Sequence, residues 1–186
     1  MDLPSNHFTH VISNFGLIGI PEPRAILSEV YRVLRPSGTA AFSIFKSVGW
    51  FDIARVAIAN IPGAPAFPTW EESFTTSMKN PQPGDDQWTK PEYFEQQIRK
   101  AGFTDVKTVL HENQTRCKNA EEYLKVFTMV MNAILRNAWS QEDFERIEPH
   151  MQGAVVDELK RRFGDGEIVL KWEAYCITTK TPPSKT

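Results

Sequence analysis

The chain has 186 residues and a nearly even balance of charge, with a formal net charge of −2 and a sequence pI near 6.1. That balance gives no electrostatic reason to expect binding to nucleic acid or to an anionic membrane. No apolar run approaches the roughly 20 residues of a membrane-spanning helix, and no basic segment followed by an apolar one opens the sequence. The two cysteines, Cys117 and Cys176, lie far apart without a CxxC or metal-binding spacing. We therefore expect reduced thiols and a soluble, cytoplasmic protein.

The first three predicted elements form a strand–helix–strand unit. Residues 8–15 are rich in β-branched and aromatic side chains and are followed by a glycine, which is typical of a buried parallel strand. Residues 24–34 place apolar side chains at helical spacing. Pro36 is predicted to stop this helix, and Gly38 to turn the chain into a second strand at 39–45. Such a unit predicts two parallel strands joined by a right-handed crossover.

A short helix predicted at 50–61 is followed by a long connection at 61–91, in which aromatic side chains alternate with prolines. Connections of this length inside a compact domain are often lids or binding loops. The aromatic side chains could enclose an apolar small molecule, or they could pin the loop to the core, and both interpretations stay open. The candidate substrate-binding residues are Trp50, Phe51, Trp70 and Phe74.

The remaining sequence predicts three helices and two strands. Thr89 is expected to cap a helix that runs to about Lys100. The other predicted elements are a strand at 106–110, a helix at 118–139, a helix from the capping signal at 140–143 to about 163, and a strand at 167–179. Pro149 should kink or divide the last helix. We expect one domain over residues 1–180, with a helical insertion at about 118–163, and a disordered tail at 181–186.

Several short phrases occur in an order that resembles a known family. They are Asp2-Leu-Pro4, the strand at 8–15, Arg32-Val-Leu-Arg-Pro-Ser-Gly38 and Ala101-Gly-Phe-Thr-Asp-Val106. In this order they resemble the class I S-adenosylmethionine-dependent methyltransferases that act on small molecules. The resemblance implies an α/β fold with a partial Rossmann-like sheet, flanking helices and a helical lid or insertion. The family's fourth, fifth, seventh and sixth strands would lie side by side, the last two antiparallel.

The resemblance also implies a cofactor, S-adenosyl-L-methionine. Asn14 and Phe15 follow a parallel strand at its carboxyl end, where α/β folds place ligands, and are the candidate cofactor-binding residues. Alternatively, Asn14 turns the chain and Phe15 packs in the core. The family's Gly-rich cofactor loop, whose glycines let the backbone approach the ligand, has no counterpart here. Gly16 and Gly19 are better explained by turn geometry, the four histidines show no metal-ligand spacing, and no residue is identified as catalytic.

Two functions stay open. The first is a methyltransferase of a small molecule, truncated and inactive alone, so that the sequence does not decide whether the chain is an enzyme. The second is a non-catalytic methyltransferase-like protein: a pseudoenzyme, a partner subunit or a small-molecule binder. In the family's strand order, the strand at 8–15 would lack one neighbour and expose unpaired hydrogen-bonding groups. We therefore expect it to pair with a second copy or with a partner chain.

Overall fold

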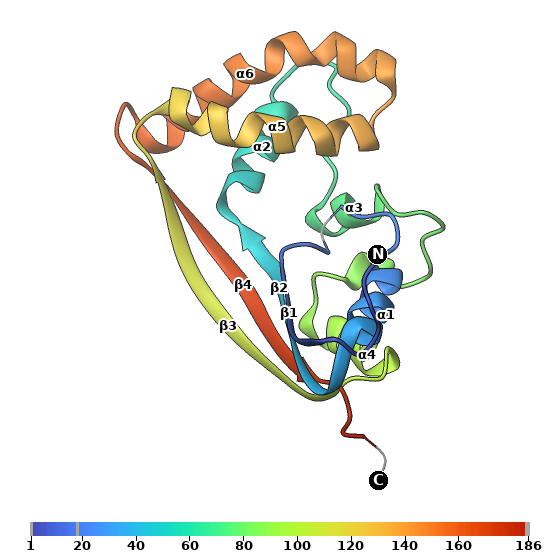
Figure 1. The fold of residues 1–186 in the computed structure, drawn as a ribbon. Helices are drawn as coiled ribbons and strands as arrows, with labels where there is room; N and C mark the ends of the chain where they lie inside the picture. The colour runs from blue at the N-terminus through green and yellow to red at the C-terminus, as the bar shows by residue number, and fades with distance from the viewer. Residues whose placement is uncertain (1, 18, 185–186) are drawn as a thin grey trace. The chain divides into compact units, whose positions relative to one another are not determined.

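The computed structural model describes residues 2–17 and 19–184, and its strands form a four-stranded sheet (Figure 1). The strands are β1 (Phe8–Asn14), β2 (Leu34–Val48), β3 (Thr104–Cys117) and β4 (Ile168–Lys180). Their order across the sheet is β1-β2-β4-β3. This order confirms the predicted sequence of the family's fourth, fifth, seventh and sixth strands.

The strand directions also agree with the prediction. β1 and β2 are parallel. The Thr181 N–H donates to the Gly38 carbonyl at 2.9 Å, and the Lys46 ammonium pairs with Glu173 at 2.7 Å. Since residue numbers rise along β2 as they fall along β4, these two strands are antiparallel. Figure 1 shows β3 running opposite to β4 as well.

Six α-helices and one short 3₁₀ helix are found among the described residues. They are α1 (Pro23–Val33), α2 (Gly49–Ala59), α3 (Trp70–Thr75), the 3₁₀ helix η1 (Asp85–Gln87), α4 (Pro91–Lys100), α5 (Ala120–Ala138) and α6 (Gln141–Phe163). None of these helices has both the length and the apolar character needed to cross a membrane.

The chain divides into two compact units, each with its own core. Unit 1 comprises Met1–Lys46, Ser77–His111 and Glu173–Thr186, and unit 2 comprises Ser47–Thr76 and Glu112–Trp172. The predicted helical insertion at 118–163 lies in unit 2, together with α2 and α3.

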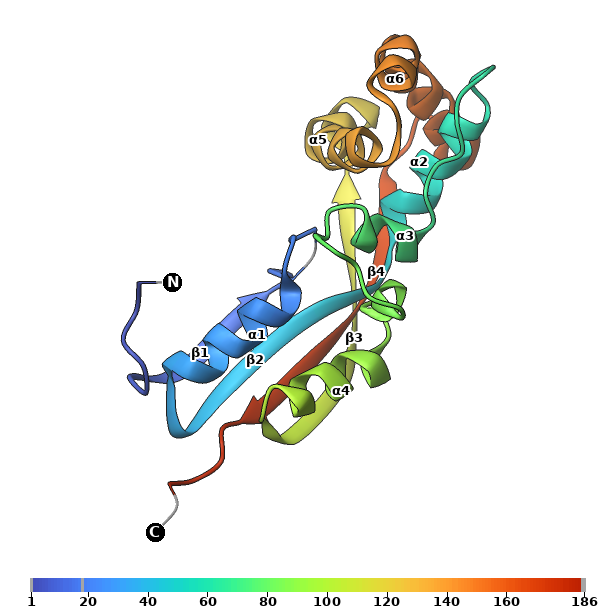
Figure 2. The ribbon, with the colours of Figure 1, turned by 90° about the vertical axis from the view of Figure 1, so that its right-hand side faces the viewer.

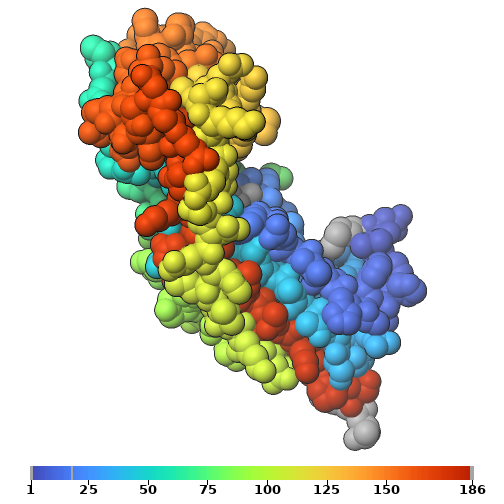
Figure 3. Space-filling view, turned by 90° about the vertical axis from the view of Figure 1, so that its left-hand side faces the viewer, coloured from blue at the N-terminus to red at the C-terminus, as the bar shows by residue number. Residues whose placement is uncertain are grey.

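In unit 1, α1 and α4 cover one face of the sheet (Figure 2). The apolar stripe of α1 buries Leu27 and Val30, so that water is excluded from the helix–sheet contact. Phe42 of β2 meets Phe94 of α4 and Phe103 edge-on, with ring centroids 5.7 and 6.3 Å apart. Figure 3 looks onto the other face of this sheet, where the strands themselves form the surface. The sheet of unit 1 is thus supported from one side by two packed helices.

In unit 2, α6 packs against α2 and α5. The Ser140 hydroxyl accepts the Asp143 N–H at 3.1 Å and caps α6, as the sequence predicts. Glu158 is buried in α6 and binds Arg161 and Arg162 with N–O distances of 2.7 and 2.5 Å. Arg162 also pairs with Asp52 of α2 at 2.9 Å, so this ion-pair network links α6 to α2.

The connection expected at 61–91 contains a helix that the sequence analysis missed. The Thr69 hydroxyl accepts the Glu72 N–H at 3.1 Å, and the Glu72 carboxylate accepts the Thr69 N–H at 2.8 Å. This reciprocal capping box begins α3. The Thr-x-x-Glu spacing is visible in the sequence, but the surrounding prolines made a loop the stronger expectation.

Two local predictions about capping and strand length are wrong, and so is the division of the last helix at Pro149, whereas a kink at Pro149 stays a prediction. The N-cap residue of α4 is Lys90 and not Thr89, which is buried. Pro91 in the first turn has no N–H, so this helix start has one backbone donor fewer in need of a side-chain acceptor. Helix α6 continues through Pro149 as one helix of 23 residues, because the missing N–H removes only one of its many hydrogen bonds. β2 begins at Leu34, directly after α1, and extends further than predicted.

The prediction of a disordered tail is wrong for its first residues. Thr181 is buried, and the Ser37 N–H donates to the Pro182 carbonyl at 3.2 Å. The tail prediction for residues 185–186 lies outside the described residues. The tail therefore begins as a continuation of β4 along the start of β2.

Candidate functional site

The carboxyl end of β1 places Asn14 and Phe15 beside Ser43 and Phe45 of β2. Asn14 lies opposite Ser43 in the parallel register. The Ser43 hydroxyl donates to Asn14 Oδ1 at 2.6 Å and accepts the Phe15 backbone N–H at 2.9 Å. The Phe15 ring stacks on Phe45, with centroids 3.7 Å apart and planes 6° from parallel. We call Asn14, Phe15, Ser43 and Phe45 the strand-end cluster.

The backbone of Phe15 is held in an unusual conformation. Its φ is +53°, in the left-handed region that side-chain-bearing residues rarely adopt. The hydrogen bond to Ser43 and the stacking on Phe45 fix this turn at the end of β1. Residues held this way often lie at functional sites. Asn14 is exposed, and its amide nitrogen donates to no other described residue.

The four candidate substrate-binding residues form an aromatic cluster in unit 2. Ring centroids of Phe51 and Trp70, and of Trp70 and Phe74, lie 5.1 Å apart, and those of Trp50 and Phe51 lie 5.6 Å apart. Trp50, Phe51 and Phe74 are buried, whereas Trp70 is half-buried. The structure thus brings the four together, largely inside the core, and their contact with a substrate stays a prediction.

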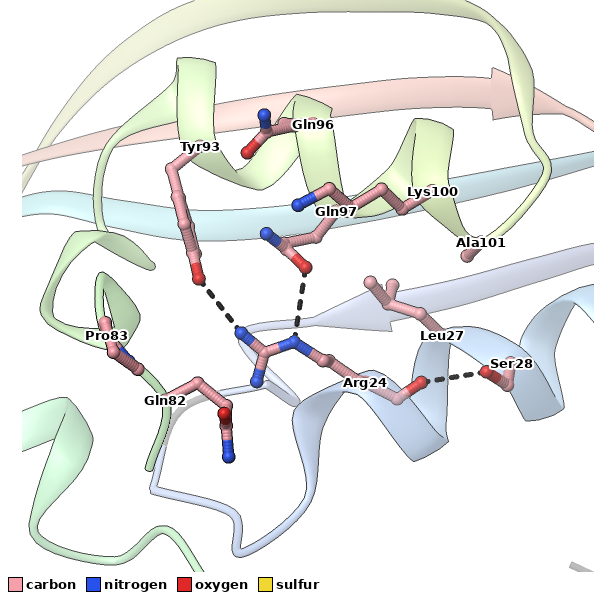
Figure 4. A pocket seen from close by; sticks show the side chains of 10 residues that line it. All are labelled: Arg24, Leu27, Ser28, Gln82, Pro83, Tyr93, Gln96, Gln97, Lys100 and Ala101. Atoms are coloured by element: carbon pink, nitrogen blue, oxygen red, sulfur yellow. Dashed lines mark hydrogen bonds between the residues drawn. The ribbon is translucent and has the colours of Figure 1, made fainter. Parts of the chain in front are cut away.

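A cavity that the sequence analysis did not identify lies between α1 and α4 in unit 1, with a volume of about 570 Å³. Figure 4 shows the side chains that line it. They are Arg24, Leu27, Ser28, Gln82, Pro83, Tyr93, Gln96, Gln97, Lys100 and Ala101. A second cavity, of about 290 Å³, shares Arg24 and Gln82 with the first. Arg24 therefore separates two cavities.

Asp85 holds Arg24 in this position. One Asp85 oxygen lies 2.5 Å from a guanidinium nitrogen of Arg24 and also accepts from Trp88 Nε1 at 3.0 Å and from the Tyr93 hydroxyl at 3.1 Å. The other oxygen accepts a second Arg24 nitrogen at 3.2 Å and the Gln82 N–H at 2.6 Å. Each carboxylate oxygen thus accepts at least two hydrogen bonds, as a buried carboxylate requires.

The hydrogen bonds decide the charge state of Asp85. Burial alone would raise the pKa of its carboxyl group, since water no longer solvates the anion. The bonds from Arg24, from the Gln82 N–H, from Trp88 and from Tyr93 outweigh that effect and lower the pKa to about 2. Asp85 in turn raises the pKa of Arg24, mainly through its hydrogen bond. The pair is ionised at neutral pH.

Sequence spacing could not reveal this site. Arg24 is 61 positions from Asp85 and 73 from Gln97, and each residue alone is an ordinary polar side chain. The only local signal was Asp85 after Gly84, whose φ of +92° turns the chain into the 3₁₀ helix.

Comparisons with known proteins find similarity to methyltransferases. Residues 1–42 match the model of the methyltransferase domain family. The chain is 29% identical to methyltransferase tpcH of Aspergillus fumigatus, 30% to methyltransferase ktnA of Aspergillus niger and 26% to acetylaranotin bis-thiomethyltransferase of Aspergillus terreus, each over 97% of its own length. It spans 61%, 63% and 58% of those relatives. The chain is thus similar in sequence to methyltransferases over about three fifths of their length.

Proposed function

We propose that the protein takes part in methyl transfer from S-adenosylmethionine to a small molecule. The observation that carries this proposal is the strand-end cluster, because ligands of parallel α/β sheets bind at the carboxyl ends of the strands. The names of the relatives support the reaction class. Since the chain spans about three fifths of their length, the reaction and its substrate are proposals for this chain.

The residues of the strand-end cluster fit one side of such a cofactor. The exposed Asn14 amide offers a donor for a carboxylate or hydroxyl group. The stacked Phe15 and Phe45 rings offer an apolar surface for a flat base. When bound, S-adenosylmethionine supplies an electrophilic methyl group on a sulfonium. The residues present then contribute by binding and orienting the cofactor, which is the main source of catalysis when two reactants must meet.

For the substrate, we propose contact with the accessible part of the unit 2 aromatic cluster. Trp70 is half-buried and packs between Phe51 and Phe74. The three buried members would support the Trp70 ring, while Trp70 itself would contact an apolar small molecule. This division gives the candidate substrate-binding residues two different roles.

Calorimetric titration of S-adenosylmethionine into the 186-residue chain tests the proposal. We expect saturable binding that weakens about five- to tenfold in Asn14→Ala, as the loss of one hydrogen bond predicts. His10→Ala is the matched control, because His10 is an exposed residue of the same strand whose side chain forms a hydrogen bond only with Thr9 among the described residues. If the folded chain shows no binding heat, or if both variants bind equally well, the strand-end cluster is not a cofactor site.

The alternative is a non-catalytic methyltransferase-like protein. It is favoured by the way Ser43 satisfies both the Asn14 carbonyl and the Phe15 N–H, which leaves few cluster groups in need of a ligand. A folded chain that ignores S-adenosylmethionine would support this alternative.

A further inference from the structure

We propose that the cavity between α1 and α4 binds a small carboxylate-bearing molecule. This site lies apart from the strand-end cluster in sequence and shares no residue with it. Its test is binding alone, so the proposal does not depend on methyl transfer.

The cavity has the size and the walls of a ligand site. Its volume of about 570 Å³ falls within the range of roughly 300–1,000 Å³ that is usual for small-molecule pockets. Leu27 and Pro83 supply apolar walls from α1 and from the segment before η1. Polar side chains of α4 face them (Figure 4). Apolar walls with a few convergent polar groups are typical of a specific small-molecule site.

Gln97 gives the strongest indication of a ligand. Its side chain is 5% exposed, and its Oε1 accepts from Arg24 Nε at 3.3 Å. Its amide nitrogen donates to no described residue, although Gln97 lines the cavity (Figure 4). This N–H opens onto the cavity and is available to a ligand oxygen there.

Lys100 supplies the charge. It lies one turn after Gln96 on α4 and lines the same cavity. Among the residues that the structure describes, no carboxylate forms an ion pair with it, whereas Arg24 is already neutralised by Asp85. The Lys100 ammonium is therefore the cation available to a ligand.

Among the described residues that line the cavity, Lys100 carries the charge that has no ion-pair partner, which selects an anion. Both oxygens of Asp85 are occupied by Arg24, Gln82, Trp88 and Tyr93, so the carboxylate has no capacity left for a cationic ligand. An amide N–H and an ammonium group side by side match the two oxygens of a carboxylate, with charge-assisted hydrogen bonds.

The experiment is calorimetric titration of sodium malonate into the full chain at low salt, with inorganic phosphate as a second probe. We expect malonate to bind saturably, more weakly as salt is added because the ion pair is partly exposed. Lys100→Gln should weaken malonate binding at least about tenfold. Gln97→Leu should weaken it as well, with circular dichroism verifying that the variant folds.

Lys79→Gln is the matched control. Lys79 is also exposed, its loss changes the net charge equally, and it lines the second cavity and not the first. We expect this variant to bind malonate like the wild type. The proposal is overturned if malonate does not bind the wild-type chain, if phosphate alone binds, or if Lys79→Gln and Lys100→Gln weaken binding equally.

Discussion

Asp85 organises the segment between α3 and α4, which has little regular structure. Its carboxylate joins α1, the segment before η1 and α4 through Arg24, Gln82 and Tyr93. The guanidinium of Arg24 also lies 5.5 Å from the centre of the Trp88 ring, at a distance where cation–π attraction contributes. One buried carboxylate therefore replaces many of the hydrogen bonds that a helix or strand would supply.

Asp85→Asn should destabilise the protein by about 1–3 kcal/mol, since the amide cannot accept all of these bonds and two polar groups lose their partners. Asp86→Asn is the control, because Asp86 is the neighbouring carboxylate and is exposed; its effect should stay within about 0.5 kcal/mol. Urea unfolding of the wild type, Asp85→Asn and Asp86→Asn measures the change in unfolding free energy that each substitution causes. Equal stability of the two variants would show that Asp85 is not the organising residue.

The same carboxylate predicts a pH dependence. The pKa of Asp85 is about 2 in the folded protein against an ordinary 3.8, so the unfolded chain binds the proton more tightly. Ionised Asp85 therefore adds to the free energy of unfolding. This addition is complete above pH 3.8 and is lost as the pH falls toward 2, by about 2 kcal/mol in total. Unfolding free energies of the wild type and Asp85→Asn, measured from pH 5 to pH 2, should converge across this window. If the two free energies instead change in parallel with pH, the predicted contribution of Asp85 is contradicted. Glu158 also has a low pKa. Because it is present in both proteins, its contribution cancels when their unfolding free energies are subtracted.

At the scale of elements, the sequence predicts what local chemistry determines. The periodic apolar stripe of α1 and the capping signal at Ser140 locate their helices because the necessary contacts lie within one or two turns. The strand-end rule led to Asn14 and Phe15, and their contact with a cofactor stays a prediction. The cavity between α1 and α4 escaped prediction because its walls come from positions as distant as Arg24 and Lys100. The capping box of α3 was present in the sequence, but proline content outweighed it.

The cap of α6 can be tested by substitution. Ser140→Ala removes the acceptor of the Asp143 N–H and should cost about 1 kcal/mol. Ser140→Asn restores an acceptor and should retain most of the stability. Amide hydrogen exchange in the first turn of α6, together with urea unfolding, distinguishes them. If alanine and asparagine behave alike, the hydroxyl is not the source of the helix start.

For the whole molecule, the open edge of β1 is the feature with most bearing on assembly. β1 is at the end of the strand order, and its sequence FTHVISN contains no charged residue and no proline. Natural edge strands usually carry such residues, which discourage pairing with other chains. Ile12 is 78% exposed on this strand. Two copies could pair their β1 edges with each other, and the partner predicted from the sequence would then be a second copy.

We predict concentration-dependent self-association of the wild-type chain, measured by sedimentation at micromolar concentration. Ile12→Lys should shift the protein toward monomer, because a lysine on an edge strand opposes pairing. Met129→Lys is the matched control: Met129 is 76% exposed, but it lies on α5. A wild-type chain that stays monomeric throughout the titration would refute the prediction.

The anchored start of the tail has a practical consequence for anyone who alters this protein. The Thr181 hydroxyl donates to the Arg35 carbonyl at 2.7 Å, and the Gly38 N–H donates to that hydroxyl oxygen at 3.0 Å. A version shortened to Lys180 would leave both groups of β2 without these partners, and the Gly38 N–H would lose its acceptor in a buried place. Purification tags and reporter fusions therefore belong after the final residue, with a spacer, so that Thr181 and Pro182 keep their bonds.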